Sequence, residues 1–291
     1  MRMILVHGIN QQGKSAQVIL DEWMPTLRAS CAMHGADPLD KLSRIEAAWY
    51  GDTLEQLSSA KVKGQAIALG TEDTPDDFDE FSVDALKEMA LRMGATESQI
   101  DSELSQTAVA LGAGLHKKWL KAIARVIETI SPARGTLALR VLGQAHAYIR
   151  NQHVHDEVNK LVRPLLLDDE PSIVVSHSLG TIVAFSLLRE FANSGNPRQC
   201  PLFVTLGSPL GIDSVRKGFM KPRVKPENVQ RWVNGADPED FIALRPELTS
   251  SNFGSGIENY SDLENGHEDP HSIAGYLSDT RIAKAIVESI Y

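Results

Sequence analysis

Residues 171–190 constrain the fold more strongly than any other part of the 291-residue chain. They begin with a short β-branched run, I-V-V at 173–175, which is typical of a buried strand. Within a few residues the pattern changes to apolar residues at helical spacing, from Leu179 to Leu187. Ser178 lies at this change, with a small residue two positions to either side. The pattern predicts a strand that turns abruptly into a helix, with Ser178 on the turn.

This turn admits two interpretations. Ser178 could be an ordinary N-cap residue that opens the helix. It could instead be a nucleophile, because a tight turn would aim its hydroxyl at the helix N-terminus, where N–H groups favour negative charge. The run S-H-S-L-G-T at 176–181 resembles the nucleophile elbow of the α/β-hydrolase superfamily, especially its lipase- and esterase-like members. The first glycine of the usual G-x-S-x-G pattern is Ser176 here.

The resemblance implies an α/β-hydrolase fold, with a mostly parallel sheet flanked by helices. It also implies a serine nucleophile followed along the chain by an acid and then a histidine. It covers residues 1–51 and 170–291, which we expect to form the hydrolase core. Residues 52–169 have a largely helical pattern. We expect them to form a helical cap inserted between two strands.

The loop after the first apolar strand, residues 2–6, also has two interpretations. Residues 8–15, G-I-N-Q-Q-G-K-S, match the P-loop pattern, in which Lys14 would contact phosphates and Ser15 would bind magnesium. The His7-Gly8 pair instead resembles the oxyanion loop of lipases. The backbone N–H groups of Ile9 and Leu179 would then stabilise the tetrahedral oxyanion.

The remainder of the sequence favours the oxyanion loop. A P-loop enzyme also needs an acidic residue at the end of a core strand to organise magnesium. The best match, residues 165–170, continues a helical pattern and so resembles the end of a helix. P-loop nucleotide binding therefore stays as the alternative function.

Two aspartates and two histidines are candidates for the other catalytic groups. Asp237 follows an apolar run at 229–233, in an N-x-x-D-P stretch that resembles the acid loop of lipase-like hydrolases, although an Asx turn would also explain it. Asp240 is the second choice. Among the histidines we favour His271 over His267, because H-S-x-x-x-Y at 271–276 better resembles the family pattern. Either could instead be a surface-loop histidine.

Four further segments carry weaker signals. Ser208, in the run L-G-S-P-L-G, is an alternative nucleophile, but a proline follows it and we interpret it as part of a turn. Residues 115–130 are amphipathic and predict a core-facing helix, a lid or a surface for peripheral membrane contact. The acidic residues 71–84 lack ligand spacing and predict a solvated loop, not a metal site. A terminal helix is expected from about Ser272 onward.

Composition excludes several classes of protein. The formal charge of −9 argues against nucleic-acid binding, and two cysteines cannot form a disulfide framework. No apolar run is long enough to span a bilayer, so we expect a cytoplasmic protein.

The sequence thus predicts a serine esterase or lipase-like hydrolase acting on a small-molecule or lipid ester, or a thioester. Ser178, His271 and Asp237 would form its triad, and no cofactor or metal would be needed. A catalytically silent binding module is the third hypothesis. The acyl chain, the leaving group and the oligomeric state are not specified by the sequence.

Overall fold

The computed structural model describes residues 1–58, 77–110, 115–194, 199–266 and 269–291. Its centre is a six-stranded sheet with the strand order β2-β1-β3-β4-β5-β6. Every neighbouring pair of these strands is parallel. The strands are β1 (Arg2–Val6), β2 (Ile45–Ala48), β3 (Ser172–His177), β4 (Cys200–Leu206), β5 (Val229–Gly235) and β6 (Glu258–Tyr260). The chain is therefore an α/β protein with a parallel sheet.

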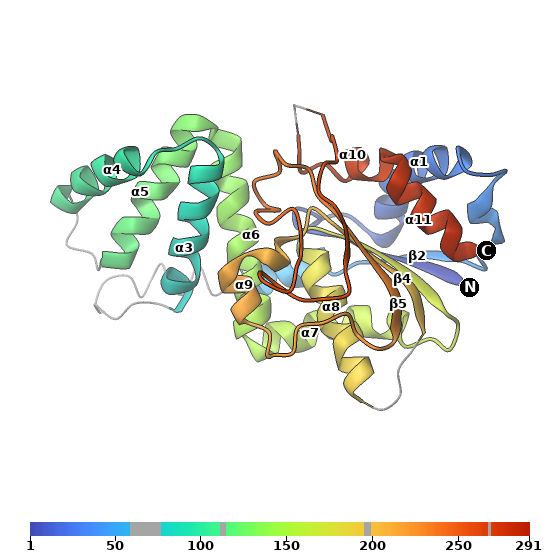
Figure 1. Ribbon diagram of the computed structural model, residues 1–291. Helices are drawn as coiled ribbons and strands as arrows, with labels where there is room; N and C mark the ends of the chain where they lie inside the picture. Colours follow the sequence, from blue (N-terminus) through green and yellow to red (C-terminus); the bar gives the residue numbers. More distant parts are fainter. Residues whose placement is uncertain (59–76, 111–114, 195–198, 267–268) are drawn as a thin grey trace.

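Helices cover both faces of the sheet (Figure 1). One face carries α1 (Ala16–Ala32), α10 (Ile273–Ser278) and α11 (Thr280–Ile290), and the other carries α6 (Pro132–Arg150), α7 (Gln152–Leu166) and α8 (Leu179–Asn193). Successive side chains of a strand point to opposite faces. Met3 and Leu5 of β1 consequently pack in the hydrophobic core beneath α1, α10 and α11. Ile4 and Val6 pack in the core on the other face, beneath α6, α7 and α8.

The segment between β2 and β3 is helical wherever it is described. It contains α3 (Asp77–Arg92), α4 (Glu97–Ala110) and α5 (Leu115–Ile130) in addition to α6 and α7. In Figure 1, α3, α4 and α5 lie beyond the sheet, whereas α7 lies against α8. Residues 71–76 of the predicted acidic loop fall outside the described residues. The side chains of most residues at the start of α5, on which the predicted polar face depends, are not described either. None of the described helices combines the length and apolarity needed to cross a membrane.

The C-terminal segment differs in one respect from the expected single helix. It consists of two helices, α10 and α11, because Asp279 has an extended backbone and interrupts the helical path. The Asp279 carboxylate accepts hydrogen bonds from the N–H groups of Arg281 and Ile282 and so caps α11. Shorter helical turns complete the fold: η1 (Pro38–Lys41), η2 (Pro209–Gly211) and α9 (Asp213–Lys217).

The strand order reverses at β1, which has β2 on one side and β3 on the other. Val6 at the end of β1 is in register with Ser176 near the end of β3. The loop after β1 therefore lies beside the turn after β3. In open parallel sheets, ligands bind beyond the carboxyl ends of the strands at such a reversal. This edge of the sheet is therefore the first place to examine for a functional site.

Candidate active site

Ser178 occupies a strained turn between β3 and α8. Its backbone angles are φ 53° and ψ −129°, a conformation that costs a non-glycine residue on the order of 1–3 kcal/mol. The turn is fixed by two hydrogen bonds, from the Ser178 N–H to the Leu206 carbonyl at 2.9 Å and from the Thr181 N–H to the Ser178 carbonyl at 3.0 Å. The Ser178 side chain makes no capping hydrogen bond. An ordinary N-cap role therefore does not explain this residue.

Two glycines make room for the turn. A Cβ atom added to Gly8 would lie 2.5 Å from the Cβ atom of Ser178. A Cβ atom added to Gly180 would overlap the carbonyl oxygens of Val6 and His7. Both glycines are thus required by the close approach of the β1 loop to the turn after β3. Ser176, which replaces the usual first glycine, is buried and donates its hydroxyl to the Val204 carbonyl at 2.8 Å.

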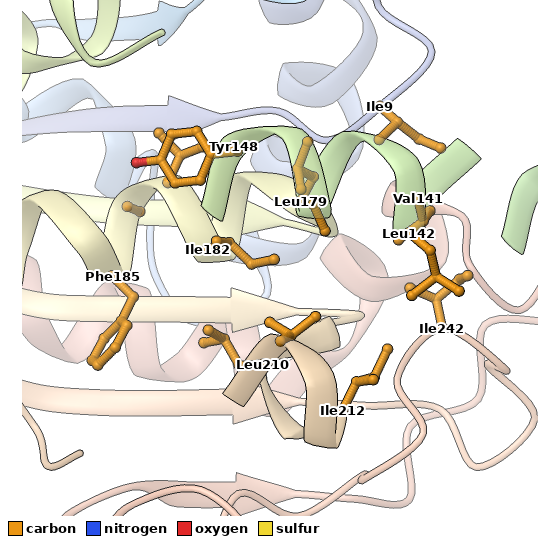
Figure 2. Close-up of a cluster of buried hydrophobic side chains, with 14 of the residues drawn as sticks. Ile9, Val141, Leu142, Tyr148, Leu179, Ile182, Phe185, Leu210, Ile212 and Ile242 are labelled. Atoms are coloured by element: carbon orange, nitrogen blue, oxygen red, sulfur yellow. The ribbon is translucent and has the colours of Figure 1, made fainter. Parts of the chain in front are cut away.

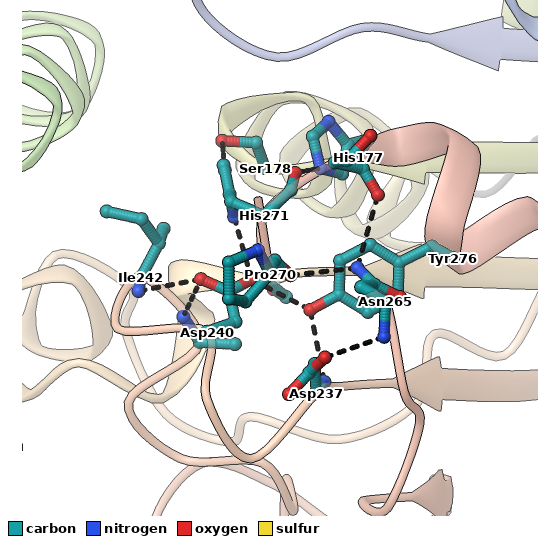
Figure 3. A network of polar contacts seen from close by, with 12 residues as sticks. His177, Ser178, Asp237, Asp240, Ile242, Asn265, Pro270, His271 and Tyr276 are labelled. Carbon is teal, nitrogen blue, oxygen red and sulfur yellow. Dashed lines mark hydrogen bonds and ion pairs between the residues drawn. The ribbon is translucent and has the colours of Figure 1, made fainter. Parts of the chain in front are cut away.

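Ser178, His271 and Asp240 form a continuous hydrogen-bonded chain (Figure 3). Nε2 of His271 lies 2.8 Å from Oγ of Ser178, and Nδ1 lies 2.7 Å from Oδ2 of Asp240. The carboxylate fixes the proton on Nδ1, which leaves Nε2 free to accept the serine proton. All three side chains are buried, with Asp240 at 0% exposure. The expected contact between His271 and Ser178 is therefore present.

The Asp240 carboxylate is fully surrounded by donors. Oδ1 accepts the N–H of Ile242 at 2.9 Å, and Oδ2 accepts both His271 and the Tyr276 hydroxyl, each at 2.7 Å. Burial acts to raise the pKa of this carboxyl, but the charge of His271 and the hydrogen bonds from His271, Tyr276 and Ile242 outweigh it. The pKa of Asp240 consequently lies below its ordinary value, and the group is an anion at neutral pH.

Asp237 is not the partner of His271, and our expectation for this residue is corrected. Its Oδ1 atom accepts the N–H of Glu239 at 2.7 Å, which is an Asx turn, and its Oδ2 atom accepts the N–H of Asn265 at 2.7 Å. The chain then turns back, with the Asp240 N–H donating to the Asp237 carbonyl at 3.0 Å. This turn carries the second aspartate, not the first, over the end of β4.

Gly207 at the end of β4 leaves the space in which these groups meet. Its φ angle is 55°, in the left-handed region that favours glycine. An added Cβ atom would lie 2.9 Å from Oδ2 of Asp240, 3.0 Å from Cε2 of Tyr276 and 3.2 Å from Cε1 of His271. A side chain at this position would therefore displace Asp240, His271 or both.

The two N–H groups expected to bind an oxyanion lie on adjacent elements. Leu179 is the first residue of α8, so its N–H has no partner within the helix. Ile9 follows Gly8, which packs against Ser178. Figure 2 shows Ile9 and Leu179 among apolar side chains that include Val141 and Leu142 of α6 and Ile242. Ile242 belongs to the loop after β5, residues 236–246, which is called the acid loop below. The apolar surrounding excludes water and would strengthen a hydrogen bond to a developing charge.

His7 and Tyr50 hold the β1 loop in place. Nδ1 of His7 donates to the Gly8 carbonyl at 2.7 Å, and Nε2 accepts the Tyr50 N–H at 3.2 Å. The Tyr50 hydroxyl donates to the His7 carbonyl. Burial lowers the pKa of His7 to about 4, so the ring is neutral at pH 7 and can accept this hydrogen bond.

The backbone around His271 is held by two side chains that the sequence did not single out. His177, next to the nucleophile, lies with Nε2 2.9 Å from the His271 carbonyl, and its Nε2–H donates to that oxygen. Burial, followed by the nearby His271 charge, lowers the pKa of His177 to about 3. Nδ2 of Asn265 donates to the carbonyls of Pro270 at 2.8 Å and Ser272 at 3.1 Å. These roles depend on partners far away in the chain, so the local sequence pattern could not predict them.

The P-loop-like residues make other contacts. Nζ of Lys14 pairs with Glu22 of α1 at 2.6 Å, and Ser15 caps α1 by accepting the Val18 N–H at 3.3 Å. The stretch 165–170, the best acidic match, ends α7 and leads into β3, and Asp168 lies within it. Asp168 therefore lies at the opposite edge of the sheet from the β1 loop, where it pairs with Arg44.

The remaining candidates have simple outcomes. Ser208 accepts the Leu210 N–H at 3.3 Å and so caps η2, as expected of a turn residue. His267 lies outside the described residues. Within the described part of the chain, no three His, Cys, Asp or Glu side chains are grouped closely enough to hold a metal ion.

Comparisons with known proteins found no family model, no curated protein and no solved structure that matches this chain. The chemistry of the site therefore has to be argued from the contacts within the chain itself.

Proposed function

We propose that this protein is a serine hydrolase of the α/β-hydrolase type, cleaving a carboxylic ester or thioester through an acyl-enzyme. The observation that carries the proposal is the Ser178–His271–Asp240 chain, with contacts of 2.8 and 2.7 Å, on a strained turn at the strand-order reversal. A serine hydroxyl is a weak nucleophile unless an adjacent base is itself oriented by a third group. The three residues also follow in the order nucleophile, acid and base, as in α/β-hydrolases.

The geometry supports the following sequence of steps. Oγ of Ser178 attacks the carbonyl carbon while Nε2 of His271 takes the hydroxyl proton. The N–H groups of Ile9 and Leu179 bind the resulting oxyanion. His271 then gives its proton to the leaving oxygen or sulfur as that bond breaks. A water molecule, activated by the same imidazole, hydrolyses the acyl-enzyme and regenerates Ser178.

The apolar surroundings of the oxyanion loop support an acyl group that is itself apolar. Val141 and Leu142 of α6 pack in the same cluster as Ile9 and Leu179. In this proposal residues 52–169 act as a cap over a core of residues 1–51 and 170–291 and shape the acyl site, although α6 and α7 of this segment also cover one face of the sheet. Apolar lining with a few directed polar groups is the usual composition of a small-molecule site.

Nucleotide binding by residues 8–15 has less support. The Lys14 ammonium is paired with Glu22, and Asp168 lies at the other edge of the sheet. Gly8 packs closely against Ser178, which leaves no space for a phosphate between these two residues. The Asp52 carboxylate accepts the Gly13 N–H at 2.6 Å, so an N–H that a P-loop would offer to phosphate is already used.

The proposal is tested with p-nitrophenyl esters of increasing acyl length, assayed with and without detergent. We expect the wild-type protein to hydrolyse at least one ester, and Ser178→Ala to lower kcat by about a million-fold, to the level of the assay background. Ser208→Ala is the matched control, since it removes another buried hydroxyl of the same edge, and it should retain most of the activity. Equal rates for wild type and Ser178→Ala would refute the nucleophile.

A further inference from the structure

We propose that Tyr276 is a positioning residue of the triad, whose hydroxyl holds the Asp240 carboxylate in the orientation that His271 requires. This inference rests on the proposed function for its role in catalysis, but not for the interaction itself. Tyr276 lies on α10, in the same segment as His271, and it is fully buried. The Tyr276 hydroxyl is thus a second donor to the Asp240 carboxylate, in addition to the His271 ring.

The direction of the Tyr276 hydroxyl proton follows from its two contacts. The N–H of Asp237 donates to the phenol oxygen at 3.1 Å and occupies one of its lone pairs. The hydroxyl proton then points to the other neighbour, Oδ2 of Asp240, at 2.7 Å. A contact of this length between a hydroxyl and a carboxylate is a charge-assisted hydrogen bond (Figure 3).

The same carboxylate oxygen also accepts Nδ1 of His271 at 2.7 Å. Oδ2 therefore has two donors, and Oδ1 has the N–H of Ile242 at 2.9 Å. A carboxylate has about four lone-pair sites, so few alternative orientations remain for Asp240. Asp237 contributes indirectly, because its N–H turns the phenol proton toward the acid.

The phenol remains a donor throughout the useful pH range. Burial, and after it the negative charge of Asp240, raises the pKa of Tyr276 well above its ordinary value. Among the described residues, the titratable groups next to His271 are Asp240, His177 from the end of β3 and Asp269 from its own loop, and Tyr276 contacts both Asp240 and His177. Of these, Tyr276 alone bonds the oxygen that holds the imidazole, so removing its hydroxyl changes that hydrogen bond most directly.

Loss of the hydroxyl has a predictable sign. Without the Tyr276 donor, Oδ2 retains more negative charge and attracts the protonated imidazole more strongly. The protonated form of His271 is then favoured, so the ring loses its proton at a higher pH than in the wild type. Asp240 is also less firmly oriented, which lowers kcat more than it changes KM.

The test compares Tyr276→Phe with Tyr148→Phe. Tyr148 is a second buried tyrosine, and its hydroxyl donates to Oδ1 of Asn159 at 2.8 Å, so each variant removes one buried phenol hydroxyl together with its hydrogen bonds. For Tyr276→Phe we expect kcat to fall about tenfold and KM to change by less than about twofold. The midpoint of the acid limb of the pH–rate profile should move to higher pH by roughly half a pH unit. For Tyr148→Phe we expect no movement of that limb.

A readout without turnover separates this inference from the proposed function. In protein labelled with ¹⁵N-histidine, the His271 signals are assigned by their loss in His271→Gln and followed by NMR as a function of pH. Their midpoint should move upward in Tyr276→Phe and not in Tyr148→Phe. An unchanged midpoint in Tyr276→Phe would overturn the inference, even if the enzyme is active. A midpoint that moves in Tyr276→Phe, combined with a wild type that hydrolyses no ester, would refute the proposed function alone.

Discussion

Asp237 and Asp240 belong to one loop, yet their carboxylates do different work. Asp237 binds the N–H groups of Glu239 and Asn265 and so ties the acid loop to the loop that carries His271. Asp240 binds the imidazole itself. The two residues therefore allow a comparison in which the same substitution removes the same charge at neighbouring positions.

We expect Asp240→Asn to lower kcat by about 10⁴-fold with little change in KM. An amide can donate a proton to Nδ1 and thereby stabilise the wrong tautomer of the base. Asp237→Asn should keep kcat within about tenfold of the wild type and lower the free energy of unfolding by about 1 kcal/mol, because one partly buried N–H loses its acceptor. Steady-state kinetics and urea unfolding measure these effects. A larger kinetic loss in Asp237→Asn than in Asp240→Asn would contradict the assignment of the acid.

The sequence predicted the region of the acid but not the residue. The stretch D-P-E-D offers two aspartates in one loop, and nothing local decides which of them reaches His271. The decision depends on the turn that the Asp237 side chain forms and on the space above Gly207. Ser178 and His271 were easier, because each adjoins the start of a helix whose apolar pattern is visible.

At the scale of elements, the site depends on the turns that end β1, β3 and β4. The strand ends are in register, with Val6 paired to Ser176 and His177 paired to Leu206. The residues just beyond them therefore meet at one edge of the sheet. Gly8, Gly180 and Gly207 are the positions at which this meeting leaves no room for a side chain.

Gly207→Ala should impair activity far more than Gly13→Ala. Both glycines have a positive φ angle, 55° and 75°, so both substitutions strain the backbone by about 1 kcal/mol. A Cβ atom at Gly13 would meet nothing within 4 Å, whereas one at Gly207 would meet Asp240, Tyr276 and His271. We expect kcat to fall more than 100-fold in Gly207→Ala, by the estimate that about 3 kcal/mol of misplacement costs about two orders of magnitude. Gly13→Ala should keep near-normal kinetics, and equal losses in both would indicate strain alone.

The helical segment between β2 and β3 supports the acid loop directly. Arg92 of α3 donates to the Pro238 carbonyl at 2.7 Å, and Glu88 of the same helix pairs with Arg245. The Arg134 guanidinium of α6 lies over the Phe241 ring, 5.8 Å from its centroid. These long-range contacts join residues far apart in the chain, so they could not be predicted from periodicity. The helices themselves could be, because their apolar spacing is local.

At the scale of the whole molecule, two buried histidines link folding to pH. His7 follows β1 and His177 is the last residue of the neighbouring strand β3, and burial lowers their pKa values to about 4 and about 3. In the unfolded chain both would titrate at their ordinary value of 6.5. Because the folded values are lower, the unfolded state binds more protons below pH 6.5. The stability that these two neutral histidines contribute is therefore fully present above pH 6.5 and is lost as the pH falls toward 3.

We expect the free energy of unfolding to decrease by roughly 2 kcal/mol for each of these histidines between pH 7 and pH 5. His177→Asn should remove about half of this pH dependence, whereas replacing the exposed His153 by Asn should leave it unchanged. Urea unfolding at several pH values measures the effect. A pH dependence in His177→Asn as steep as that of the wild type would show that His177 is not held neutral in the fold.

The arrangement of the sheet followed from the sequence to a useful extent. The apolar runs at 2–6, 173–175 and 229–233 located β1, β3 and β5, whereas β6, Glu258–Tyr260, contains no apolar β-branched residue. The strand order and the pairing of β1 with both β2 and β3 did not follow from any local pattern. They depend on how the helices pack on the two faces, which is a property of the whole chain.

The covalent step itself provides the most direct measurement. The folded protein is treated with a fluorophosphonate, digested, and examined by mass spectrometry. We expect one adduct, on the peptide that contains Ser178, with labelling abolished in Ser178→Ala and strongly slowed in Asp240→Asn. An adduct on a different serine, or labelling of Ser178→Ala at the wild-type rate, would contradict the proposed chemistry.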